Sequence, residues 1–274
     1  GILCFYPFTA EDALIYYRYA ENLINNGALV YNEGEPINAM TSPFQAWLSA
    51  ALFLLVGETV VSNKVVAFAA LLASAALLWR HFRGRKEAQL LVFPLLLLPS
   101  CVLIWTFGGL ETPFLLLLVT ATIIFVDARV STKETIGLQT LTAVFLLAGG
   151  GFLVRYDSAP FFVPVVLYAA SRARALGAIA IAAIAGAALP VAWLAVSHFY
   201  YGDILPTSYY VKHPTVSLGY ALKNASYIAL NLVYAGVLPI LLLALTSRRA
   251  EASAQSGAKK PMWWLYLAMA FEML

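Results

Sequence analysis

The chain alternates between long apolar runs and short polar segments. A helix needs roughly 20 apolar residues to span the hydrocarbon core of a bilayer, which is about 30 Å thick. The runs predict spanning helices at 60–79, 88–107, 112–126, 137–154, 159–170, 175–197 and 227–246, and another that starts at residue 261. The apolar run at 44–56 is short, and runs of that length are more often interfacial or re-entrant.

The distribution of charge favours a segment at 44–56 that does not cross. In that case twelve of the seventeen Lys and Arg residues fall on one side, namely Arg80, Arg83, Arg85, Lys86, Arg129, Lys133, Arg172, Arg174, Arg248, Arg249, Lys259 and Lys260. Cytoplasmic loops are enriched in Lys and Arg, so this side is predicted to be cytoplasmic. A crossing at 44–56 would put residues 11–42 in the cytoplasm and scatter the acids over both faces.

Composition places the chain in the membrane. Its residues are 62% hydrophobic and 11% charged, whereas soluble domains are about 45–50% apolar and about 25% charged. We therefore predict an all-α polytopic transmembrane helical bundle that forms one domain over 1–274, lies in the cell membrane among lipids, and is a fragment cut within a span at each end. The net charge of +3 is spread along the chain, so nucleic acid is not an expected partner.

The first outer loop, residues 8–43, begins with an amphipathic helical pattern that ends at Asn26-Gly27. Asp12 and Tyr16 share one face of this helix, and Glu11 and Arg18 share another. Thr9 and Asp12 have the spacing of a capping box, so Asp12 could serve only to cap the helix. Alternatively, a carboxylate at the level of the lipid headgroups could accept a proton from a hydroxyl group.

Three further outer segments carry polar side chains. Glu111 follows a Gly-Gly turn, and Arg155 and Asp157 lie between two spans. A solvated acid or a local ion pair explains these residues equally well. The late loop, 198–226, is rich in tyrosine, which fits either an interfacial aromatic belt or a wall on which a sugar stacks.

Several chemistries lack their usual motifs. The chain has no Asp-x-Asp, P-loop, Gly-x-Gly-x-x-Gly, His-Glu-x-x-His or Gly-x-Ser-x-Gly sequence, so nucleotide donors, zinc hydrolysis and serine hydrolysis are not expected. Ionisable groups are almost absent from the middle of the predicted spans, which weakens an ion-coupled transporter.

The polar loops resemble a known class of enzymes. The strings EDALIYYRYAENL (11–23), GALVYNEGE (27–35) and TSPFQAW (41–47) resemble the first loop of GT-C polytopic glycosyltransferases, especially the mycobacterial-type terminal arabinofuranosyltransferases and their bacterial relatives. GLET (109–112) and YGDILPTSYYVK (201–212) are similar to later loops of that class, and the resemblance covers nearly the whole chain. RYDS (155–158) stands where relatives often have Arg-Pro-Glu/Asp-Gly.

The resemblance implies an inverting transferase that moves a sugar from a polyprenyl-phosphate donor to an extracytoplasmic acceptor, a glycan of the cell wall or envelope or a lipid. The alternative is a lipid or polysaccharide transporter, or flippase, without catalysis. Loss of a phosphate needs no proton, so one base suffices. The expected roles are a base at Asp12, with Glu11 second; phosphate binding by Lys212, Arg155 and Arg18; and substrate binding by Glu111, Asp157, Tyr209 and Thr207. A divalent cation (Mg²⁺, Mn²⁺ or Ca²⁺) could share the neutralisation of the phosphate, but the sequence does not require one.

Overall fold

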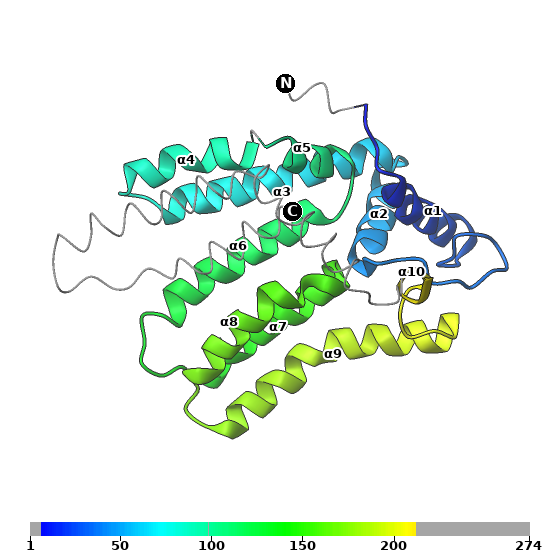
Figure 1. Cartoon of the computed structure of the whole chain (residues 1–274). Coiled ribbons are helices and arrows are strands. Elements are labelled where there is room, and N and C mark those ends of the chain that lie inside the picture. Colours follow the sequence, from blue (N-terminus) through cyan, green and yellow to red (C-terminus); the bar gives the residue numbers. More distant parts are fainter. Residues whose placement is uncertain (1–6, 98, 212–274) are drawn as a thin grey trace, which may run out of the picture.

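The structure is a computed structural model that describes residues 7–97 and 99–211, and over these residues it is all-helical, without a strand (Figure 1). The helices are α1 (Glu11–Asn26), α2 (Pro43–Val56), α3 (Val60–His81), α4 (Lys86–Leu97), α5 (Ser100–Phe107), α6 (Thr112–Arg129), α7 (Leu138–Val154), the 3₁₀ turn η2 (Tyr156–Ser158), α8 (Ala159–Ser171), α9 (Leu176–Tyr201) and α10 (Thr207–Val211). The predicted spans at 227–246 and from residue 261 lie outside the described residues.

Several helices could cross a membrane. Helices α3, α6 and α9 are long and apolar enough to span, and the pair α4 and α5 would count as a fourth span if read as one bent helix. Helices α7 and α8 coincide with predicted spans. With 17 and 13 residues they are shorter than α3, α6 and α9. The prediction of a membrane protein therefore holds for the described part of the chain.

One predicted span is broken. Residues 88–107 were expected to form a single helix, but α4 and α5 meet at a 58° bend. Pro99 precedes α5 with an extended backbone, φ −62° and ψ 123°. Proline has no N–H to continue a helical hydrogen-bond pattern, so the chain starts a new helix after it.

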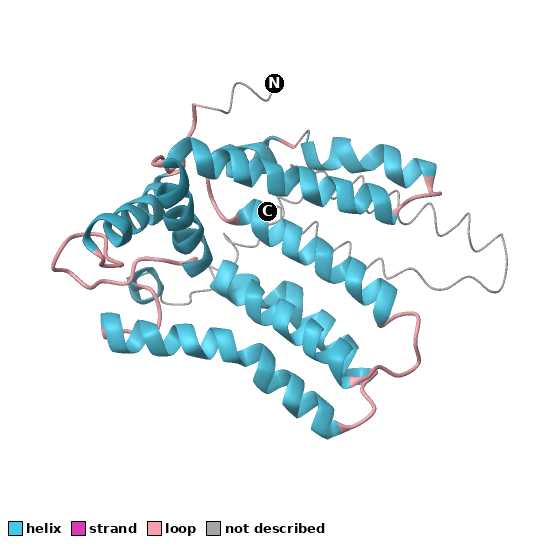
Figure 2. Ribbon diagram, turned by 180° about the vertical axis from the view of Figure 1, so that it is seen from behind, coloured by secondary structure: helices cyan, strands magenta, loops and turns pink. Residues whose placement is uncertain are grey.

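The helices form a row with a cap at one end. In Figures 1 and 2 the long helices run side by side, while α1 and α2 lie across one end of the row. The turn between α5 and α6, the junction of α7 with α8 and the end of α9 lie at this same end. The loops that join α3 to α4, α6 to α7 and α8 to α9 lie at the opposite end. That residues 44–56 do not cross the membrane stays a prediction.

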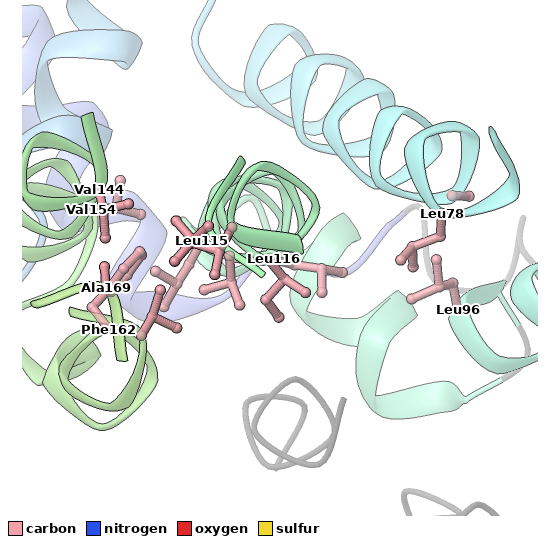
Figure 3. Packing of buried hydrophobic residues seen from close by; sticks show 14 of the residues in the cluster. Leu78, Leu96, Leu115, Leu116, Val144, Val154, Phe162 and Ala169 are labelled. Atoms are coloured by element: carbon pink, nitrogen blue, oxygen red, sulfur yellow. The ribbon is translucent and has the colours of Figure 1, made fainter. Parts of the chain in front are cut away.

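Apolar packing centres on α6. Leu115 and Leu116 of α6 lie in a buried cluster with side chains of α3, α4, α7 and α8 (Figure 3). Helices α7 and α9 also pack closely, because a Cβ on Gly149 would come within 2.0 Å of the Gly186 carbonyl oxygen. Charged residues flank both helices, because Glu111 directly precedes α6 and Arg155 directly follows α7.

Buried polar contacts attach the cap to the turn that precedes α6. The Tyr17 hydroxyl of α1 and the Gln45 amide of α2 both donate to the Gly109 carbonyl oxygen, each at 3.1 Å. The Gln45 amide also donates to Asn63 of α3 at 3.0 Å. The turn is thus held by α1 and α2, and α2 is itself bonded to α3 at the same side chain.

Gly109 is predicted to be intolerant of any side chain. Its φ is +78°, and a Cβ would lie 2.0 Å from the Tyr17 hydroxyl. The left-handed conformation alone costs a non-glycine residue roughly 1–2 kcal/mol. The overlap with Tyr17 adds to this cost, so Gly109→Ala should lower the melting temperature in detergent by more than the backbone strain would by itself.

Gly27→Ala is the matched control, because Gly27 has a φ of +70° but nothing within 4 Å of an added Cβ. In a double-mutant cycle, Tyr17→Phe should recover part of the loss caused by Gly109→Ala. Equal losses for the two glycine substitutions would contradict the overlap with Tyr17.

Candidate functional site

A buried carboxylate marks the start of α6. Glu111 directly precedes this helix and its residue is only 4% exposed. One carboxylate oxygen, Oε1, lies 3.4 Å from Nη1 of Arg155. The other, Oε2, is buried and has no hydrogen-bond partner within the described part of the protein. Burial raises the pKa of Glu111 by more than the charge of Arg155 lowers it.

Arg155 links this acid to a second one. It follows the last residue of α7 in an extended conformation, and its side chain is 38% exposed. Its Nε and Nη2 donate to the two carboxylate oxygens of Asp157 at 2.8 and 2.9 Å. Burial lowers the pKa of Arg155, but the bonds to Asp157 and the charge of Glu111 raise it by more. Arg155 is therefore a permanent cation with a carboxylate on either side.

Helix α1 brings Tyr16 and Asp12 to the same cluster. The Tyr16 hydroxyl is 2.7 Å from the Thr41 hydroxyl. Burial, and next the negative charge of Glu111, raise the pKa of Tyr16. Asp12 contributes to the raised pKa of both Tyr16 and Glu111, and so lies within electrostatic reach of them.

The capping role considered for Asp12 is wrong. Helix α1 is capped at Ala10 and has no side-chain hydrogen bond at its N-terminus. Asp12 and Glu11 instead occupy the first turn as exposed carboxylates, where the helix dipole favours negative charge. Asp12 is thus left accessible to a solute.

The other predicted site residues that the structure describes are Arg18, Thr207 and Tyr209. Arg18 is exposed on α1, and none of the ion pairs between described residues includes it. Thr207 uses its N–H and its hydroxyl to bond the Asn38 carbonyl oxygen, at 2.7 and 2.8 Å, which indicates a structural role. Tyr209 is about half exposed on α10. Lys212 lies outside the described residues.

The late loop packs directly on the first loop. Besides its contacts with Thr207, Asn38 donates through its amide to Ser197 at 2.8 Å, and Ser197 donates to the Asp203 carbonyl oxygen at 2.8 Å. The Tyr201 hydroxyl donates to the Leu29 carbonyl oxygen at 2.7 Å. The two loops that the sequence singled out are therefore one structural unit at one end of the helices.

Tyr16, Thr41 and Asn38 were not among the predicted site residues. Tyr16 could have been found, because it lies one helical turn after Asp12 on the same face. Asn38 gave no signal, since Ser197 and Thr207, which it bonds across the two loops, are more than 150 residues away along the chain.

The cluster is built around a cation that the protein itself supplies. Glu111 and Asp157 both direct a carboxylate oxygen to Arg155. Across residues 7–97 and 99–211, no group of three or more His, Cys, Asp or Glu side chains could hold a metal ion. An anion that enters here would meet the guanidinium of Arg155.

Glu111 should make the stability of the protein depend on pH. A carboxyl group with a raised pKa in the folded state stabilises the fold fully below its unfolded pKa of about 4.3, and this contribution is lost as pH rises through the folded pKa. The melting temperature in detergent should therefore fall as pH rises above the unfolded pKa, and Glu111→Gln should flatten that fall. Glu33→Gln, at an exposed position, serves as control; an unchanged pH slope in Glu111→Gln would contradict the raised pKa.

Known proteins were compared with the chain at three levels. No family model, no curated protein and no solved structure matches it. The function must therefore be argued from the residues of the cluster and from the membrane helices that carry it.

Proposed function

We propose that the protein is a GT-C-type membrane glycosyltransferase. It transfers a sugar, with inversion, from a polyprenyl-phosphate donor to a glycan or lipid acceptor on the extracytoplasmic side of the cell membrane. The observation that carries this proposal is the cluster of Asp12, Glu111, Arg155 and Asp157 at one end of the helices. Arg155 pairs with Glu111 and Asp157, and the exposed Asp12 lies within electrostatic reach of Glu111.

The charges of the cluster suit the two halves of such a reaction. The acceptor hydroxyl must lose a proton as it attacks, and Asp12 is an exposed carboxylate able to take it. The departing phosphate carries its own negative charge, and Arg155 is a nearby cation that stabilises it. A glycosidase, in contrast, needs a second carboxyl group to protonate the leaving group.

Apolar surface at the same end suits a polyprenyl chain. The last residues of α2, Leu54, Leu55 and Val56, are 69%, 80% and 64% exposed. Phe199, near the end of α9, is 85% exposed. A lipid tail that packs on such side chains would bring its phosphate to the depth of the charged cluster.

Transport without catalysis has less support. A polar path through the helices would need polar groups free to contact a solute. Ser74, Thr106 and Thr122 instead bond the carbonyl oxygens of their own helices, at 2.9, 2.7 and 2.7 Å. These three hydroxyl groups are thus satisfied within their own helices.

Asp12→Asn should abolish sugar transfer while leaving the fold intact. Membranes that contain the protein would be given a radiolabelled polyprenyl-phosphate sugar and a mixture of envelope acceptors. Loss of a general base lowers the rate by about 10²–10⁴-fold. Glu33→Gln, an exposed change in the same loop, should keep full activity, and Glu11→Gln should have a smaller effect than Asp12→Asn. Undiminished transfer by Asp12→Asn would remove Asp12 as the base.

The orientation can be tested by cysteine labelling. Glu33→Cys lies in the first loop and Arg83→Cys in the loop between α3 and α4, both exposed. A membrane-impermeant maleimide should label Glu33→Cys in intact cells and Arg83→Cys only after the cells are opened. The reverse pattern would place Asp12 in the cytoplasm and contradict an extracytoplasmic site.

A further inference from the structure

We propose that Asp157 occupies the place of a phosphate group on Arg155 and is displaced when a phosphate binds. The inference rests on the proposed function for the identity of the anion, the phosphate of a polyprenyl phosphate. It assigns Asp157 as an internal competitor for the donor, in place of the direct substrate contact expected from the sequence.

The contact between Arg155 and Asp157 has the geometry of phosphate recognition. Nε and Nη2 of Arg155 each donate to a separate oxygen of Asp157, at 2.8 and 2.9 Å. A guanidinium binds two oxygens of a carboxylate or of a phosphate through the same pair of parallel hydrogen bonds. A phosphate can therefore take over this edge of Arg155 without any movement of the guanidinium.

The two carboxylates around Arg155 differ in how easily they can leave. Glu111 is buried, with a side chain only 5% exposed, and it faces Nη1. The side chain of Asp157 is 70% exposed. An exposed ion pair contributes little to stability, because water solvates both charges once they separate. Asp157 can thus turn into solvent while Glu111 keeps Arg155 in position.

The backbone around Asp157 is anchored independently of its side chain. The adjacent Tyr156 hydroxyl accepts a hydrogen bond from the indole N–H of the buried Trp193 on α9. The Ser158 N–H donates to the Arg155 carbonyl oxygen at 3.1 Å. Loss of the contact between Arg155 and Asp157 therefore leaves the η2 turn in place.

The surroundings of Glu111 set it further apart from Asp157. Its Oε2 is buried and unpaired among the described residues, and an orphaned polar atom of this kind is costly. Burial raises the pKa of Glu111 by more than the charge of Arg155 lowers it, and this buried acid is not the one that a phosphate displaces.

The proposal is tested by calorimetric titration of the purified full chain in detergent with undecaprenyl phosphate, and separately with inorganic phosphate. Asp157→Asn removes the competing charge but keeps the shape of the side chain. It should bind undecaprenyl phosphate about three- to fivefold more tightly, since an exposed ion pair is a weak competitor. Arg155→Gln should lose binding at least tenfold.

The control separates competition from a general change in charge. Asp203→Asn removes one negative charge from an exposed position in the late loop and should leave the affinity unchanged. Weaker or unchanged binding by Asp157→Asn, or tightening equalled by Asp203→Asn, would overturn the proposal. If Asp157→Asn melts below the wild type, Asp157→Ser provides the same comparison.

The two probes distinguish the source of the phosphate. Tightening with both assigns the site to the phosphate group itself, and tightening with undecaprenyl phosphate alone assigns it to the lipid-linked form; either supports the inference. A wild-type protein that shows this binding pattern but transfers no sugar would refute the glycosyltransferase and leave the role of Asp157 standing.

Discussion

The contact between Glu111 and Arg155 is the constraint on which the outer end of the structure depends. It joins the residue before α6 to the residue after α7, two helices whose lengths are otherwise aligned only by apolar packing. Apolar packing tolerates small sliding movements, whereas an ion pair with one buried member does not. Removing a carboxylate from water has a large desolvation cost. Attraction to the partner offsets this cost only when the two charged groups keep their close geometry.

Buried polar contacts hold the turn that precedes this buried carboxylate. The turn before Glu111 is held by Tyr17 and Gln45, which both bond the Gly109 carbonyl oxygen. These bonds fix the backbone from which Glu111 projects, so the acid cannot relax toward solvent. The raised pKa of Glu111 is the electrostatic consequence of that restraint. Stability and site chemistry are therefore coupled at one turn of the chain.

The sequence predicted the helical class and most helix positions, because apolar length and periodicity report directly on burial in a membrane. It placed the surface helix at 11–26 and its end at Gly27, where the backbone has the positive φ that glycine allows. It failed at Pro99, where a local backbone constraint interrupts a continuous apolar run. Hydropathy carries no information about such a break.

The site was only partly predictable for a related reason. Asp12, Glu111, Arg155 and Asp157 stood out as charged residues in an apolar chain, and the structure brings them within electrostatic range of one another. The exposure of each side chain could not be predicted from the sequence, because exposure depends on contacts between distant segments. Glu111 and Asp157 are both single acids beside a turn, yet one side chain is 5% exposed and the other 70%.

That difference in exposure separates Glu111 from Asp157 in how easily each can leave Arg155. A buried carboxyl group exchanges protons and partners slowly with its surroundings, and so it suits a fixed role beside Arg155. An exposed carboxylate leaves its partner at little cost. Asp12 is also exposed, and none of the ion pairs between described residues includes it. Arg155 pairs with Glu111 and Asp157, and the exposed Asp12 lies within electrostatic reach of Glu111. The cluster thus combines one buried acid with two exposed ones.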